Sequence, residues 1–446
     1  MPPFDFSTVD TGATAWVLAS AALVLLMTPG LAFFYSGMVR AKHALAMLMQ
    51  NYVTIAIVSL VWVVCGFSLA FGEGNGFIGD FRLAGLQHIG DQLPGYADSF
   101  AQVIPPMVFV VFQLMFAVIT PALILGSTAD RWKFGAFVPF IALWSILVYS
   151  PVAHWVFSPE GWLFKRGALD FAGGTVVHIN AGVAGLALAI FLGKRRGWPS
   201  QPMRPHNVPF VLLGAGLLWF GWFGFNAGSA LGANQLAGYA FVNTNTATAV
   251  AMLAWLGVEK LRDGRATTLG AASGAVAGLV AITPCAGFIS PLGSIAVGAI
   301  AGGACALAVA LKGMVRIDDS LDVVAVHLIG GILGSLCVGL FATVDTNPLG
   351  ADGLFYGGGF GLLGKQALAV IAVMAYSFVM TMIIAFVINL VIKMRVPADE
   401  EDEGLDYALH GETAYEFSTL GGSVGAVPMS DSERAPAHHH REEVAP

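Results

Sequence analysis

Long apolar stretches, separated by short charged or Pro/Gly-rich breaks, occupy most of the 446-residue chain. A run of about 18 or more apolar residues is long enough to cross a bilayer as a helix. The pattern predicts eleven transmembrane helices, at residues 13–38, 45–71, 101–128, 134–157, 173–192, 209–228, 237–257, 269–288, 293–311, 321–344 and 366–391. We therefore expect an all-α polytopic membrane protein.

The positions of the basic residues predict how the chain is oriented. Positively charged loops tend to stay in the cytoplasm. With the N-terminus outside, all of the 21 Lys and Arg residues fall on the cytoplasmic side except Arg82, Lys165, Arg166 and Lys365. We predict an N-out, C-in protein that crosses the cell (inner) membrane many times.

Composition agrees with this class and excludes several others. The chain is 57% apolar and 11% charged, and its 55 glycines suit closely packed membrane helices. The four cysteines all lie in apolar runs, so neither a disulfide framework nor a thiolate metal site is expected. No P-loop, HExxH motif or nucleophile elbow is present. We predict a protein that is not an enzyme, without cofactor, metal or nucleic-acid partner.

The last part of the chain differs from the rest. Residues 1–394 form the predicted transmembrane domain, and residues 395–446 form an acidic segment followed by a mixture of Gly, Ser, Pro, Ala and His. We expect a cytoplasmic regulatory tail. Its first part, up to about residue 417, carries apolar anchors and could dock, whereas the remainder has the composition of a disordered segment.

Two histidines lie within apolar spans in matching sequence frames. His178 is followed by glycines at the same spacing as His327, namely Gly182 and Gly185 against Gly331 and Gly334. In the predicted orientation the fifth span runs inward and the tenth runs outward. The copies are therefore inverted, which predicts a repeat of helices 1–5 and 6–10 plus a C-terminal helix. Such repeats place a substrate site near the midplane.

Both histidines are predicted to lie deep in the bilayer. His178 follows Asp170 by eight residues, and His327 follows Asp319 by eight residues. Each distance corresponds to about 12 Å of helix, which reaches the middle third of a core about 30 Å thick from opposite sides. The two imidazoles could therefore meet.

Ionisable rings at this depth need a reason. A single one would be explained as a core histidine bonded to a neighbour, but two in matched frames favour a functional pair. Burial disfavours a charged ring, and each neutral ring offers one N–H and one lone pair. Such a pair can bind a small polar solute or pass a proton without a fixed charge in hydrocarbon.

Two features lie at the predicted outer ends of these spans. Asp170 can cap the backbone N–H groups of the helix that begins near Gly173, or it can attract a cation to the vestibule. Residues 219–229 are rich in aromatic rings and glycine and end in Ser229. This segment is either an interfacial aromatic belt or a lined mouth whose ring faces bind a cation.

Several motifs along the chain are similar to those of one known family. They are PGLAFFYSG from Pro29, FQLMFAVITPALILG from Phe112, DFAGGTVVHINAG from Asp170, GWFGFNAGSA from Gly221, FVNTNTATA from Phe241, DDSLDVVAVH from Asp318 and EGLDYALHGETAY in the tail. On these residues the chain resembles the ammonium transporter family (Amt/MEP, related to the Rh glycoproteins), and it is most like a bacterial Amt.

The resemblance implies roles for particular residues. The family's twin pore histidines correspond to His178 and His327, and its stacked gate phenylalanines to Phe116 and Phe225. Its residues for substrate recruitment correspond to Trp222, Ser229 and Asp170, with Phe157 at the position of a further tryptophan of the outer cation site. Because Phe157 departs from the family pattern, Trp162 is a second candidate for completing this site.

The resemblance also implies a function and partners. The expected activity is nitrogen uptake, in which NH4+ is recruited, deprotonated and conducted as NH3, with or without the proton, past the twin histidines; methylammonium would serve as an analogue. The alternatives are an ammonium sensor with PII-linked signalling and a Rh-like electroneutral NH3 or CO2 channel. The family forms homotrimers, and its bacterial members bind a PII-type signal protein at the cytoplasmic face.

Overall fold

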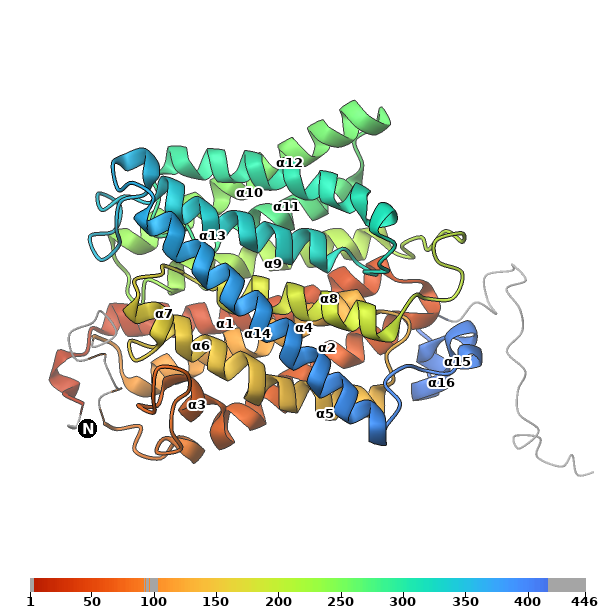
Figure 1. The fold of residues 1–446 in the computed structure, drawn as a ribbon, viewed down its shortest axis with the longest axis horizontal. Coiled ribbons are helices and arrows are strands. Elements are labelled where there is room, and N and C mark those ends of the chain that lie inside the picture. Colours follow the sequence, from red (N-terminus) through yellow and green to blue (C-terminus); the bar gives the residue numbers. More distant parts are fainter. Residues whose placement is uncertain (1–3, 92, 94–95, 97–102, 416–446) are drawn as a thin grey trace, which may run out of the picture.

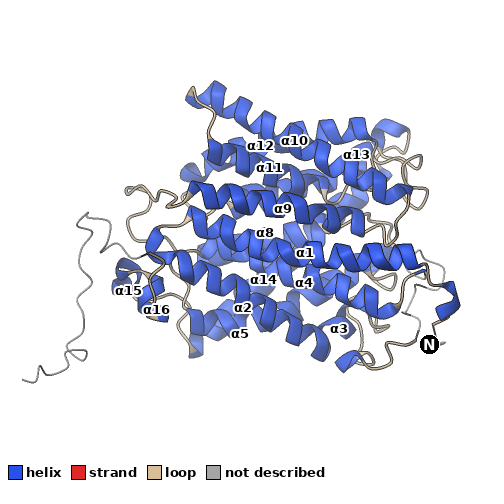
Figure 2. Ribbon diagram, turned by 180° about the vertical axis from the view of Figure 1, so that it is seen from behind, coloured by secondary structure: helices blue, strands red, loops and turns tan. Residues whose placement is uncertain are grey.

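The protein is a bundle of roughly parallel long helices (Figures 1 and 2). The computed structural model describes residues 4–91, 93, 96 and 103–415, and within these ranges it contains no β-strand. Large apolar side chains are exposed on the outer helices, among them Leu60, Leu253 and Val391. An apolar exterior suits contact with lipid or with another apolar surface.

The first half of the bundle begins with the long helix α1 and ends with the helix that carries His178. Three of its spans include a π-helical segment, in which hydrogen bonds skip five residues instead of four. The elements are α1 (Thr11–Met38), α2 (Ala44–Val61), η3 (Trp62–Gly66), α3 (Phe67–Phe71), α4 (Pro106–Thr128), α5 (Phe134–Trp144), η6 (Ser145–Tyr149), α6 (Ser150–Phe157), α7 (Trp162–Lys165), η7 (Gly174–Ile179) and α8 (Asn180–Leu192).

The second half runs from α9 to α13 and is followed by one more long helix, α14. Its elements are α9 (Val208–Gly228), α10 (Gln235–Asp263), α11 (Thr268–Ile282), α12 (Pro291–Val315), η8 (Val324–Ile329), α13 (Gly330–Phe341) and α14 (Gly361–Val391). The short 3-10 helices of the described chain are η1 (Phe6–Thr8), η2 (Ala41–His43), η4 (Ala84–Leu86) and η9 (Leu354–Tyr356).

The all-helical membrane architecture predicted from the sequence is confirmed. Within the described residues, 10 helices are long and apolar enough to cross a membrane. The remaining predicted span is α11, which has 15 residues and ends at Ile282, just before Thr283 and Pro284. In the first half a Thr-Pro pair also occurs, at Thr120 and Pro121, but it lies inside the long helix α4. The number eleven and the N-out orientation stay predictions.

The two halves meet along helices that correspond in the repeat. Helix α1 packs along α9, and α8 and η7 of the first half contact η8 and α13 of the second. Helix α14 crosses the bundle diagonally and contacts α5, α8 and α13 (Figure 1). Because α14 touches both halves, it holds together the region in which η7 and η8 meet.

The C-terminal helices α15 (Ala398–Glu403) and α16 (Leu405–His410) lie at one end of the bundle, which we call the tail face (Figure 1). η1 and the start of α1 lie toward the other end, which we call the opposite face. On the tail face α16 packs on η2 and on the start of α2. The predicted disordered remainder of the tail lies outside the described residues.

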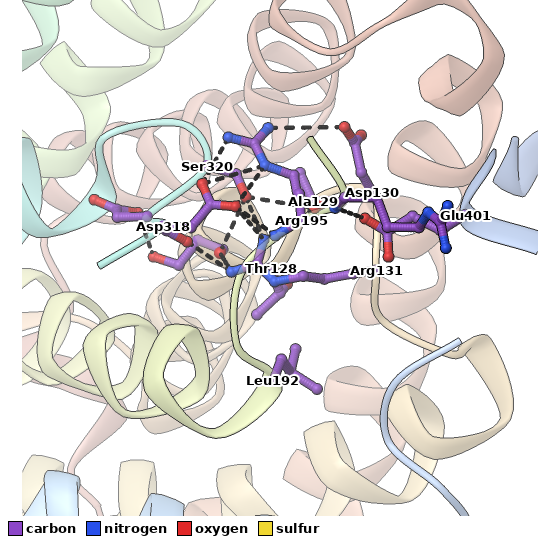
Figure 3. Close-up of polar contacts among 12 residues, drawn as sticks. Thr128, Ala129, Asp130, Arg131, Leu192, Arg195, Asp318, Ser320 and Glu401 are labelled. Carbon is purple, nitrogen blue, oxygen red and sulfur yellow. Dashed lines mark hydrogen bonds and ion pairs between the residues drawn. The ribbon is translucent and has the colours of Figure 1, made fainter. Parts of the chain in front are cut away.

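A buried ion-pair cluster joins three loops at the tail face (Figure 3). Arg195 donates to the Asp318 carboxylate from Nη2 at 2.8 Å, from Nε at 3.0 Å and from its backbone N–H at 2.7 Å. Arg131 donates to the Asp318 carbonyl at 2.6 Å and to Ser320 Oγ at 2.6 Å. Burial lowers the pKa of Arg131 to about 10. The cluster fixes the loops that follow α4, α8 and α12.

Candidate functional site

His178 and His327 lie within the π-helical segments η7 and η8, one from each half. The His178 N–H donates to the Gly173 carbonyl at 3.1 Å, five residues back along the chain. The exposed fraction is 1% for His178 and 3% for His327. π-helical turns inside membrane helices are frequent at functional sites because they redirect one side chain.

The two imidazole rings are in direct contact. Their Nδ1 atoms are 3.3 Å apart, and the ring centroids are 5.4 Å apart with an interplanar angle of 24°. One Nδ1 must donate and the other accept, because a neutral ring has one N–H and one lone pair. The buried Nε2 of His178 has no hydrogen-bond partner in the described chain. The pair can therefore exchange hydrogen bonds with a solute.

Glycine lets the two histidine segments come this close. A Cβ added to Gly182 would lie 2.4 Å from the backbone nitrogen of Leu328, the residue after His327. A Cβ on Gly331 would lie 3.0 Å from Ile179 and 3.2 Å from the His178 side chain. The matched glycines seen in the sequence thus sit at the crossing of the two halves.

Aromatic rings continue the line from the histidines toward the opposite face. Phe225 lies 6.1 Å from His178 between ring centroids, with an interplanar angle of 30°, and Phe116 lies 4.3 Å from Phe225 at 34°. Phe112 contacts Phe116 edge-on at 4.9 Å. Phe116, Phe225, His178 and His327 thus form one continuous series of rings.

Trp222 lies beside the histidines and not at an open mouth. It is 2% exposed, its ring stacks on His178 at 5.4 Å with an angle of 18°, and its Nε1 donates to Thr283 Oγ1 at 2.8 Å. Ser229 follows seven residues later, about 10 Å further along α9. Among the residues assigned to recruitment, Trp222 is therefore the deepest in the bundle.

The structure places Asp170 as a cap for η7. Its carboxylate accepts the backbone N–H groups of Gly173, Gly174 and Thr175 at 2.8, 2.7 and 2.7 Å. Burial raises the pKa of Asp170, while these hydrogen bonds oppose the shift. In the second half Asp319 accepts the Val324 N–H at 2.8 Å. A buried carboxylate therefore holds the start of each histidine segment.

The other outer residues lie apart from the ring series. The Ser229 hydroxyl donates to the Phe225 carbonyl at 2.8 Å, which leaves its oxygen lone pairs able to accept a hydrogen bond. The Phe157 carbonyl accepts the Tyr96 hydroxyl at 3.1 Å. Within the described chain, the ring contacts of Phe116 and Phe225 do not include Phe157.

Trp162 belongs to a different aromatic group. Its ring packs near Trp155 at 5.8 Å and Phe77 at 6.0 Å, and the Arg166 guanidinium lies 5.7 Å from its centroid. A second cation on the same face would be repelled by Arg166. The Trp162 ring thus already has a cation against it in this structure.

Sequence reasoning missed several residues of the site. No motif gave Thr283 a role, yet it anchors the Trp222 indole. The π-helical turns at His178 and His327 leave no pattern in the apolar spacing that separates them from ordinary helix. Only the aspartate eight residues before each histidine hinted at the paired caps.

Comparison with known proteins identifies the family. The profile of the Ammonium Transporter Family matches residues 15–415. The chain belongs to this family. An ammonium transporter of Mycobacterium tuberculosis is 52% identical over 440 residues, covering 93% of this chain and 92% of that protein.

Solved structures agree with this family membership. The crystal structure of Saccharomyces cerevisiae Mep2 has a TM-score of 0.85 and 38% identity, and the match covers 93% of each chain. A protein described as a Sensor Amt Protein has a TM-score of 0.81 and 32% identity, with 90% of this chain and 98% of that chain covered.

Membership of this family indicates the general function of the protein. This ammonium transporter family member is a multi-pass membrane protein whose relatives transport ammonium, and they are named as transporters and not as enzymes. The predicted family and the non-enzymatic class are thereby confirmed. Within the described residues no group of three or more His, Cys, Asp or Glu side chains could hold a metal ion.

Proposed function

We propose that the protein takes up ammonium by deprotonating NH4+ above the His178–His327 pair and conducting NH3 along the two rings. The observation that carries the proposal is the 3.3 Å contact between the two Nδ1 atoms, buried beneath the stacked rings of Phe225 and Phe116. In the series Phe116, Phe225, His178 and His327, the two histidines are the residues whose rings can donate or accept a hydrogen bond.

The physical reason for splitting the ion is the cost of burying charge. An ammonium ion between stacked phenyl rings would lose its water without gaining a counter-charge, whereas neutral NH3 can donate to and accept from an imidazole. K+ is similar in size but has no proton to give up. The pathway therefore selects ammonium by its chemistry.

Each outer residue receives a role under this proposal. Ser229 and Phe157 recruit the hydrated ion, Phe116 and Phe225 form the gate, and Asp170 holds η7 while lowering the potential of the vestibule. Trp222, which the sequence assigned to recruitment, completes the desolvated wall beside His178.

A flux measurement on reconstituted protein tests this function. Liposomes containing the protein should take up ammonium and methylammonium and exclude K+. Current recorded on a solid-supported membrane after an ammonium jump should accompany the flux if the proton also crosses. Ammonia flux without current would limit the proposal to electroneutral conduction, as in the Rh-like alternative, and equal permeation of K+ would overturn it.

The sensor alternative is favoured by one observation, the likeness to the Sensor Amt Protein. The higher identity to a protein named as a transporter favours uptake. Growth of an uptake-deficient strain at low ammonium and low pH distinguishes the two functions, because a pure sensor would not restore growth.

The assembly and surroundings of the protein form part of the same proposal. We propose a homotrimer in the inner membrane, N-out and C-in, with residues 1–394 spanning the membrane and residues 395–446 as a cytoplasmic tail open to a PII-type partner. The exposed apolar side chains of α10 and α12 support contact between subunits. Native mass spectrometry should give three copies.

A further inference from the structure

Lys42, His43 and the first residues of α2 hold the tail: Lys42 donates to the Asp402 carbonyl, and the other contacts involve His43 and Asp406. The Leu405 N–H, at the start of α16, donates to His43 Nδ1 at 3.3 Å. The Asp406 carboxylate accepts the N–H groups of Leu45 and Ala46 at 3.0 and 2.8 Å. The first contact joins α16 to η2, and the second joins it to the first turn of α2.

The first contact determines where the proton of His43 resides. Because Nδ1 accepts the Leu405 N–H, it carries a lone pair, and the ring is neutral with its proton on Nε2. That Nε2 is buried and has no hydrogen-bond partner in the described chain. The docked tail is therefore compatible only with the uncharged ring.

A competing partner lies next to the same nitrogen. Asp130 Oδ1 is 3.9 Å from His43 Nδ1, and both side chains are 1% exposed. Asp130 Oδ1 lacks a hydrogen-bond partner in the described chain, while Oδ2 accepts from Arg40 at 3.1 Å. A small rotation of the ring would bring a protonated Nδ1 within hydrogen-bond distance of Oδ1.

We propose that protonation of His43 moves its Nδ1 from the Leu405 amide to the Asp130 carboxylate and so releases α16 from the first loop. Nδ1 can serve only one of the two partners, since it must be an acceptor for Leu405 and a donor for Asp130. In the predicted orientation this device makes tail docking sensitive to cytoplasmic pH.

The charges around His43 come from several elements. Burial opposes a cationic ring most strongly, and Arg40 and Lys42 on its own loop and Arg195 after α8 oppose it too, whereas Asp130 favours it. Helix α16 adds Asp406 and His410. Burial raises the pKa of Asp130, but the Arg195 and Arg40 guanidinium groups help to hold it below its usual value, so Asp130 can provide the countercharge for the released state.

The direction of the pH effect follows from the two states. The docked tail requires the neutral ring, whereas release of the tail frees Nδ1 to bind a proton, which an ordinary histidine does near pH ~6.5. Protons therefore bind preferentially to the released state. Docking is favoured above this pH and weakens as the pH falls below it.

Hydrogen–deuterium exchange of the full-length protein in nanodiscs tests the proposal. After correction for intrinsic exchange, protection of residues 398–410 should fall about tenfold between pH ~7.5 and pH ~5.5. His43→Asn should show little change over this range, because its amide oxygen can still accept the Leu405 N–H but cannot titrate. Burial raises the pKa of Asp406, so a loss of protection caused by Asp406 would persist in His43→Asn.

Two matched histidine variants complete the test. His206 contacts the tail through Tyr415 Oη at 3.0 Å, and the His410 ring lies 5.1 Å from Phe134. His206→Asn and His410→Asn should each keep the wild-type pH dependence. A flat wild-type profile, an unchanged transition in His43→Asn, or loss of the transition in either control would overturn the proposal. If His43→Asn did not fold, the pH dependence of protection in the wild type and in these two controls would still test the proposal.

Discussion

Trp222 and Trp219 stand one turn apart on α9, but their indole N–H groups have different surroundings. Trp222 Nε1 donates to Thr283 Oγ1, whereas the buried Trp219 Nε1 has no partner in the described chain. Trp222 also covers one face of His178. The pair therefore offers a matched comparison of a tryptophan at the site with one outside it.

We predict that Trp222→Phe slows methylammonium uptake and lowers stability by about 1 kcal/mol, the usual contribution of one hydrogen bond. Trp219→Phe should leave both properties close to wild type. Uptake into proteoliposomes and thermal unfolding in detergent provide the two measurements. Equal losses in the two variants would contradict the role given to Trp222.

Asp170 allows capping and cation attraction to be separated. Asp170→Ala leaves the N–H groups of Gly173, Gly174 and Thr175 without their acceptor, which we expect to cost about 1–3 kcal/mol. Asp170→Asn keeps an acceptor oxygen without the charge, so its melting temperature should lie nearer to that of the wild type. If Asn destabilised the protein as much as Ala, capping by the side-chain oxygen would not explain the role of Asp170.

At the scale of elements, the crossing of η7–α8 with η8–α13 determines how the histidines meet. We predict that Gly182→Ala forces the segments apart, because the new Cβ would lie 2.4 Å from Leu328 N. Overpacking of this kind costs about 1–3 kcal/mol, and uptake should fall strongly. Gly216→Ala on α9 is the control, since nothing lies within 4 Å of its Cβ position. Wild-type uptake in Gly182→Ala would disprove the tight crossing.

The ion-pair cluster at the tail face predicts a pH effect on stability. Burial raises the pKa of Asp318, but the Arg195 guanidinium outweighs burial and holds the pKa below its usual value. A carboxyl whose folded pKa is lowered stabilises the protein above the unfolded value of about 3.9, and this contribution is lost as the pH falls through the folded pKa. Thermal stability should therefore drop steeply in acid below about pH 4.

Removing the carboxylate at neutral pH should have a similar result. Asp318→Asn leaves buried Arg195 without its partner, a change that typically costs about 3–5 kcal/mol. The exposed pair of Arg262 and Asp263 provides the control, and Asp263→Asn should cause no measurable change. Thermal unfolding at pH 7 measures both variants. Similar melting temperatures for the two would show that the buried cluster does not stabilise the fold.

At the scale of the molecule, apolar run lengths were sufficient to predict the class and the order of the helices. The frames around His178 and His327 were sufficient to predict two matching segments, because an inverted repeat keeps the spacing of its glycines. These features are local in sequence. The approach of the two rings followed from depth alone, without knowledge of π-helical turns.

What the sequence could not predict depends on contacts between distant segments. Helix α11 is short because the chain turns at Thr283. By contrast, another Thr-Pro pair, Thr120 and Pro121, lies inside the long helix α4. Trp222 lies against His178 because its indole N–H donates a hydrogen bond to Thr283, which follows the last residue of α11. The contact of His43 with Leu405 joins residues 362 positions apart. The spacing of residues within one segment does not indicate such contacts between distant segments.

The central claim is that His178 and His327 act together to select ammonium by deprotonation. The most direct test compares ammonium and K+ fluxes through His178→Ala and His327→Ala proteins in liposomes. We predict that each variant either stops conducting or admits K+. In the second case the ratio of ammonium flux to K+ flux should fall by at least about tenfold, or about 1.4 kcal/mol. Wild-type ammonium flux with unchanged exclusion of K+ in both variants would contradict it.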